Sequence, residues 1–97
     1  MTPRILLIAG PRPEIIKLSP VYHALRAMPD VESPLCWVRQ QAHGAMAPFN
    51  EFGMKVDEIV PVHRTEGTLA EALSWIVQGV DRVLAALRPD LVLVQGD

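Results

Sequence analysis

The chain has 97 residues, of which 49% are hydrophobic and 21% charged, and its formal net charge at pH 7 is −2. This length and composition predict one globular unit with a hydrophobic core, and the near-neutral charge excludes the basic surplus typical of nucleic-acid-binding proteins. A single cysteine, Cys36, excludes an intramolecular disulfide and favours a reducing, cytoplasmic location.

The chain opens with an apolar strand, predicted over residues 4–9, which leads into a helix from about residue 13 to residue 28. The apolar run is too short for a membrane span or for the core of a signal peptide, so we expect neither export nor membrane anchoring. Pro20 lies inside the helix and is expected to kink or split it. The buried face of the helix is predicted to consist of Ile15, Leu18, Tyr22 and Leu25.

Two further strands are predicted in the middle of the chain, at residues 35–38 and 58–60. Between them, a helix is predicted at about 42–52, made irregular by its internal glycine and proline and closed by Gly53. This alternation of strands and helices is typical of βαβ units.

The most regular helix of the chain follows a polar loop. Thr68 and Glu71 have the spacing of a capping box at its start, and Pro89 is expected to stop it. Apolar residues recur along it in steps of three and four, at Leu69, Leu73, Ile76, Val77, Val80, Val83, Leu84 and Leu87.

A fourth strand is predicted at residues 91–94, where an uninterrupted run of Leu and Val fits a strand buried on both faces of a parallel sheet. The four strands together predict a Rossmann-like α/β fold, a doubly wound parallel sheet of order 3-2-1-4. Because Asp97 directly follows this strand and no helix comes after it, we interpret residues 1–97 as the leading part of a longer enzyme.

The turn after the first strand has the features of a phosphate site. Gly10 allows a tight turn, and the prolines on either side of Arg12 stiffen the loop that presents it. Glu14 complements the positive end of the helix, whose free N–H groups are expected to form an anion site beside Arg12 and Lys17. In a sheet of order 3-2-1-4, this turn meets residues 95–97 at the switch point between strands one and four. Two cations and a carboxylate there suit a phosphorylated substrate that loses or gains a proton.

These segments also resemble a known enzyme family. Residues 10–20, GPRPEIIKLSP, are similar to the GTRPExxKxxP opening of the non-hydrolysing UDP-N-acetylglucosamine 2-epimerases. Residues 40–53 match the next segment of the family in spacing, and residues 88–97, RPDLVLVQGD, resemble its strand that ends in His/Gln-Gly-Asp. The similarity runs in register along the whole chain.

The resemblance implies both an architecture and a reaction. Family members are several times longer and have two Rossmann-like domains in the GT-B arrangement, so this chain would be the leading part of the first domain, without the second. The family interconverts UDP-GlcNAc and UDP-ManNAc through loss of the C2 proton and of UDP, followed by re-addition, and needs no nicotinamide cofactor. For the full-length protein we expect a cytoplasmic homodimer that serves cell-envelope polysaccharide biosynthesis.

Residue by residue, the resemblance assigns catalysis to Arg12, Lys17 and Asp97. Arg12 and Lys17 would neutralise charge on the leaving diphosphate, and Asp97 would transfer a proton or hold the group that does. Pro11 departs from the family's threonine, which removes a hydroxyl and a backbone N–H from the phosphate-facing loop. Further substrate contacts are expected from Gly10, Pro13, Glu14, Gln95 and Gly96.

A second departure concerns regulation. The Gln-His pair with which many bacterial members bind a second, activating substrate molecule reads Gln40-Gln41 here, and an arginine of those members aligns with Glu66. His43 or Arg64 could substitute in part. We therefore interpret Gln40, Gln41 and His43 as the remnant of a regulatory site.

Plainer interpretations stay open for these residues. Arg12 and Lys17 could be solvated residues at a helix start, and Asp97 could be only the N-cap of a following helix. The three histidines have no metal-ligand spacing, so no metal site is expected, and Cys36 is expected to be a small buried hydrophobe. Trp75 is a packing residue or a candidate oligomer contact.

Two other functions compete with the epimerase. A nucleotide-sugar glycosyltransferase shares the architecture, and fold alone does not separate the two. A small flavodoxin-like binding module, complete in these 97 residues, would instead fold cooperatively on its own.

Overall fold

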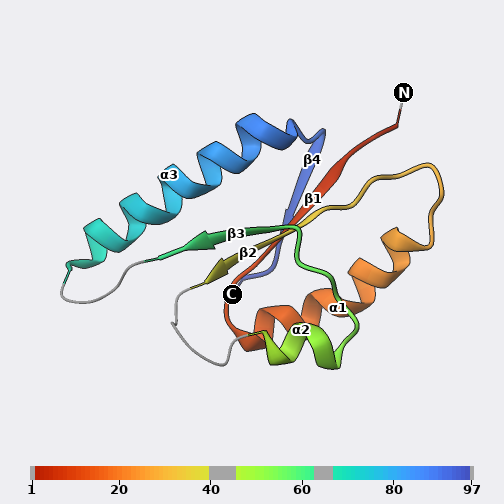
Figure 1. The fold of residues 1–97 in the computed structure, drawn as a ribbon, viewed down its shortest axis with the longest axis horizontal. Helices are drawn as coiled ribbons and strands as arrows, with labels where there is room; N and C mark the ends of the chain where they lie inside the picture. The colour runs from red at the N-terminus through yellow and green to blue at the C-terminus, as the bar shows by residue number, and fades with distance from the viewer. Residues whose placement is uncertain (1, 40–45, 63–66, 97) are drawn as a thin grey trace.

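The computed structural model describes residues 2–39, 46–62 and 67–96. They form a parallel sheet of four strands in the order β3-β2-β1-β4, so the predicted order is confirmed. Figure 1 shows α3 on one face of this sheet and α1 and α2 on the other. The elements are β1 (Ile5–Ala9), α1 (Arg12–Arg26), β2 (Leu35–Arg39), α2 (Ala47–Glu51), β3 (Glu58–Pro61), α3 (Leu69–Leu87) and β4 (Leu91–Val94).

Two hydrophobic clusters hold the layers together, one on each face of the sheet. Successive side chains of a strand point to opposite faces, so Leu7 packs toward α1 and α2 while its neighbour Leu6 packs toward α3. The cluster under α1 and α2 contains Leu7, Ala9, Ile15, Leu18, Tyr22, Leu35, Trp37, Phe49 and Met54. The cluster under α3 contains Leu6, Cys36, Val38, Val60, Val62, Ala72 and Val83.

Helix α1 runs through Pro20 as a single helix, so of the two effects expected of this proline, a kink or a split, the split is wrong. Pro20 and Ile16 are both exposed, so water can replace the donor that Pro20 cannot offer to the Ile16 carbonyl. The opposite side of the helix is buried, as predicted, and keeps α1 on the sheet. Its buried residues are Ile15, Leu18, Ser19 and Tyr22, with Leu25 packed against the same cluster.

The helix predicted at residues 42–52 is shorter in the part of the chain that the structure describes. It spans Ala47–Glu51 and is followed by Gly53 at a φ of 64°, a left-handed conformation that glycine adopts without strain. Residues 42–45 lie outside the described part of the chain.

The capping box of α3 is confirmed. The Glu71 backbone N–H donates to Thr68 Oγ1 at 3.1 Å, and the Thr68 backbone N–H donates to Glu71 Oε1 at 3.2 Å. At its other end, α3 stops before Pro89 as expected, with Arg88 as the C-cap in a left-handed conformation.

Gly79 allows α3 to lie close to β3. It is buried, and a Cβ built on it would lie 2.2 Å from Val60 Cγ1. No real Cβ contact is that short, so the layer spacing at this point depends on the absence of a side chain.

The burial predicted for β4 is wrong. Leu91, Val92 and Val94 are 52%, 37% and 69% exposed. The reason is position, because β4 is the last strand in the order of the described sheet, while α3 packs on β3 and α1 packs on β1. The outer edge and much of both faces of β4 therefore remain uncovered by the described helices.

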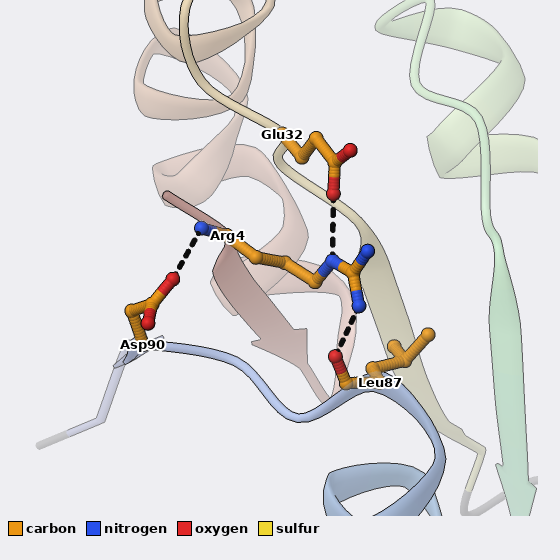
Figure 2. A network of polar contacts seen from close by, with 4 residues as sticks. All are labelled: Arg4, Glu32, Leu87 and Asp90. Atoms are coloured by element: carbon orange, nitrogen blue, oxygen red, sulfur yellow. Dashed lines mark hydrogen bonds and ion pairs between the residues drawn. The ribbon is translucent and has the colours of Figure 1, made fainter. Parts of the chain in front are cut away.

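Arg4 lies just before β1 and contacts Glu32, Leu87 and Asp90, as Figure 2 shows. Its backbone N–H donates to Asp90 Oδ2 at 2.8 Å, and its Nε donates to Glu32 Oε2 at 2.7 Å. The Arg4 guanidinium also donates to the Leu87 carbonyl at the end of α3. These bonds link the start of β4 to the start of β1, at the edge of the sheet opposite the candidate site.

Candidate functional site

The ends of β1 and β4 place the two halves of the predicted site at one edge of the sheet. The strands are parallel and paired up to Ile8 and Val94, so Gly10 and Gln95 leave the sheet at the same edge (Figure 1). Gln95 is half-buried and Gly96 is exposed. The predicted pairing of β1 with β4 is thus confirmed, while Asp97 lies outside the described residues.

Glu14 closes the turn that follows β1. Its Oε1 accepts a hydrogen bond from the buried Gly10 N–H at 3.0 Å. A Cβ on Gly10 would lie 2.9 Å from the same oxygen, so a side chain there would displace the Glu14 carboxylate. Glu14 therefore shapes the loop directly, in addition to its expected interaction with the helix dipole.

The backbone at the start of α1 offers fewer free donors than the sequence suggests. The N–H groups of Glu14 and Ile15 both donate to the Pro11 carbonyl, at 3.0 and 3.3 Å. Pro11 and Pro13 have no N–H to give. The N–H groups of Glu14 and Ile15 are thus used within the chain, and the exposed cationic side chains at this turn are those of Arg12 and Lys17.

Arg12 has a partner that sequence reasoning missed. Its Nη2 donates to Glu51 Oε2 at 3.3 Å, and the two side chains are 59% and 55% exposed. Glu51 is the last residue of α2, which packs against α1. The two residues are 39 positions apart, and no motif links them, so only the packing of α2 on α1 could reveal the pair.

Several remaining groups have structural roles. His23 Nε2 lies 2.7 Å from the Phe52 carbonyl oxygen, which ties α1 to the end of α2. His43 and His63 lie outside the described residues. Within the described ranges, no three His, Cys, Asp or Glu residues are placed to hold a metal ion. None of the helices in those ranges is both long and apolar enough to cross a membrane.

Cys36 is buried in β2, as a small hydrophobe would be. Burial of the thiol and, to a smaller extent, the carboxylate of Glu58, the β3 partner of Cys36, together raise the pKa of Cys36 to about 11. The thiol is therefore protonated at neutral pH, which is the inert form.

This pKa predicts a loss of stability in alkali. The folded state holds the thiol neutral, whereas the unfolded state releases its proton near pH 9.0. The free energy of unfolding is therefore unaffected by this group below that pH. It should fall by roughly 3 kcal/mol as the pH rises through 11, a two-unit shift. We expect the stability difference between the wild type and Cys36→Ala, measured by urea unfolding, to shrink over this interval. A difference that is constant between pH 8 and pH 11 would contradict this.

No protein-family model matches the chain. Among curated proteins, it is 32% identical over 94 residues to the UDP-N-acetylglucosamine 2-epimerase of Escherichia coli K12 and 34% identical over the same length to the probable UDP-N-acetylglucosamine 2-epimerase of Ralstonia solanacearum. Each match covers 97% of this chain and 25% of the relative. The chain thus spans about a quarter of the length of these relatives.

Solved structures give the same result. A crystal structure of a UDP-N-acetylglucosamine 2-epimerase matches all of the chain with a TM-score of 0.91 at 28% identity, and the chain covers 27% of that protein. The UDP-GlcNAc 2-epimerase of Neisseria meningitidis, bound to UDP-GlcNAc, matches 97% of the chain with a TM-score of 0.87 at 30% identity, and 26% of its own length is covered.

Proposed function

This chain is related in sequence and in fold to the amino-terminal part of the UDP-N-acetylglucosamine 2-epimerases, and we propose that it contributes one wall of the active site of such an enzyme. The proposed reaction interconverts UDP-GlcNAc and UDP-ManNAc. The single observation that carries the proposal is the placement of the GPRPEIIK turn beside the end of β4, in a fold whose relatives are named for this activity.

The proposed chemistry is an elimination followed by an addition. A base removes the proton at C2 of the sugar, the C1–O bond to UDP breaks, and a glycal forms. UDP then adds back to C1, and a proton is returned to C2 on the other face. The sequence of steps is redox-neutral and requires no nicotinamide.

The described residues fit distinct parts of this chemistry. Arg12 and Lys17 would neutralise the negative charge that grows on the departing diphosphate. Gly10 and Glu14 would set the shape of the turn, with Gln95 and Gly96 forming the opposite side. Pro13 would fix the first turn of α1. Asp97 would carry out or support proton transfer at C2.

The test is formation of UDP-ManNAc from UDP-GlcNAc by the complete gene product, with no acceptor present. We expect product to appear without an acceptor and the rate to fall sharply in Arg12→Ala. A glycosyltransferase of the same architecture would release UDP only in the presence of an acceptor, and that result would overturn the proposal.

We also propose that the full-length protein is a cytoplasmic homodimer that serves cell-envelope polysaccharide biosynthesis. Support for dimerisation comes from α3, where Trp75 is 45% exposed and Leu69, Leu73 and Val77 are more exposed still. Exposed apolar residues at helical spacing are typical of an interface. Light scattering of the full-length protein should give the mass of two copies, and Leu73→Glu should shift it toward one.

Regulation by substrate is expected to be weak in the full-length enzyme. Gln41 and Glu66 stand where regulated members carry histidine and arginine, and both positions, with Gln40 and His43, lie outside the described residues. We expect a hyperbolic dependence of rate on UDP-GlcNAc concentration, and a reverse reaction that starts without added UDP-GlcNAc. A strongly sigmoidal rate curve would show that a second substrate molecule does activate the enzyme.

A further inference from the structure

The Arg12–Glu51 pair places a carboxylate on the guanidinium that faces the proposed diphosphate site. The contact is a single hydrogen bond of 3.3 Å between Nη2 and Oε2, and both side chains are more than half exposed. An exposed pair of this kind contributes little to folding. Its position matters more, because Arg12 begins α1 directly after the Gly10 turn.

Glu51 is presented to Arg12 by a fixed backbone. Phe49 of α2 is fully buried in the cluster under α1. The Phe52 carbonyl is bonded to His23, and the Lys55 backbone N–H donates to Tyr22 Oη at 2.9 Å. Three contacts thus hold the end of α2 and the segment after it against α1, so the Glu51 carboxylate stays near the Arg12 side chain.

We propose that Glu51 competes with the diphosphate of the substrate for Arg12 and so lowers the affinity of the enzyme for its nucleotide. This inference rests on the proposed function, because it takes Arg12 as a ligand of the diphosphate. A nucleotide phosphate must either displace the Glu51 carboxylate from Arg12 Nη2 or bind beside it and be repelled by its negative charge. In either case, the positive charge available to the ligand is smaller than that of Arg12 alone.

Competition of this kind has a defined kinetic signature. The Arg12–Glu51 contact exists in the free enzyme and, once the diphosphate has displaced Glu51 on binding, is absent from both the substrate complex and the transition state. Its removal should therefore lower KM and leave kcat unchanged. A residue that merely stabilised the fold would not produce this split, and neither would one that acted in the chemical step.

The experiment compares Glu51→Gln with wild type in the complete gene product, using calorimetric titration with UDP and with uridine. We expect UDP to bind about two- to fivefold more tightly to Glu51→Gln, in line with the strength of exposed ion pairs, and uridine to bind equally to both. KM for UDP-GlcNAc should fall by a similar factor at constant kcat. The gain should shrink as salt is added.

Two controls separate this effect from others. Glu32→Gln removes the same charge from an ion pair with Arg4 at the opposite edge of the sheet, and it should leave UDP affinity unchanged. In an Arg12→Ala background, Glu51→Gln should have no further effect on UDP affinity, because the two residues act through one contact.

The possible failures are distinguishable. Failure of the wild type to bind UDP, or an Arg12→Ala variant with full UDP affinity, would overturn the proposed function and the role of Glu51 with it. UDP binding that depends on Arg12 but is unchanged or weaker in Glu51→Gln would overturn only the competition. A gain of the same size in Glu32→Gln would assign the effect to net charge and would also overturn it.

Discussion

Replacing Asp97 by Asn in the complete gene product is expected to lower turnover by a factor on the order of a hundred or more while substrate affinity changes little. Asp97 follows β4 by three residues, and β4 ends beside the Gly10 turn, so its carboxylate is proposed to serve proton transfer at the sugar. An amide of the same shape can neither accept nor return that proton. The measurement is the steady-state rate of UDP-ManNAc formation.

The same substitution separates catalysis from helix capping. Asn caps a helix about as well as Asp does, so Asp97→Asn would leave both stability and turnover near normal if capping were the only role of Asp97. Asp90→Asn is the matched control, because Asp90 accepts a bond from the Arg4 backbone at the opposite edge of the sheet. We expect near-normal turnover in that variant. Equal losses in the two variants would point to a general defect of folding and not to proton transfer.

Gly79→Ala should destabilise the protein although alanine is the better helix former. The new Cβ would lie 2.2 Å from Val60 Cγ1, so α3 must move away from β3 or Val60 must leave its rotamer. Overpacking of this kind costs about 1–3 kcal/mol, which exceeds the gain of up to about 1 kcal/mol in helix propensity. Urea unfolding of the complete gene product should show the net loss.

A second substitution tests the cause of that loss. Val60→Ala removes the Cγ1 atom and should destabilise the wild type by leaving a cavity. In the Gly79→Ala background, the same change makes room for the new methyl group, so its cost should be smaller or reversed. Strict additivity of the two substitutions would mean that the contact between α3 and β3 is not the cause.

The strands, helices and layers were predictable from local patterns, and the sheet order followed from the fold class that their alternation indicates. Leu6 and Leu7 alternate between the two clusters, and Thr68 with Glu71 sets the start of α3 from four consecutive residues. The Gly10 turn could also be predicted, because glycine permits a tight turn and the prolines fix the backbone around it. Such features need no knowledge of distant contacts.

The remaining features arise from packing between distant segments. Glu51 contacts Arg12 only because α2 packs on α1. From the sequence, Gly79 only lowers the helix propensity of α3, whereas in the structure it makes room for Val60. The composition of β4 suits a covered strand, yet its exposure is set by its neighbours in space. Pro20 was expected to kink or split α1, but the helix continues through it, with buried residues on both sides of the proline.

The position of β1 inside the sheet has a consequence for synthesis. β1 leaves the ribosome before β4, and Asp90, which links β4 to it through Arg4, comes 86 residues after Arg4. At about 5–20 residues per second, that delay is roughly 4 to 17 s. Throughout it, one edge of the apolar strand Ile5–Ala9 has no partner and can pair with other chains.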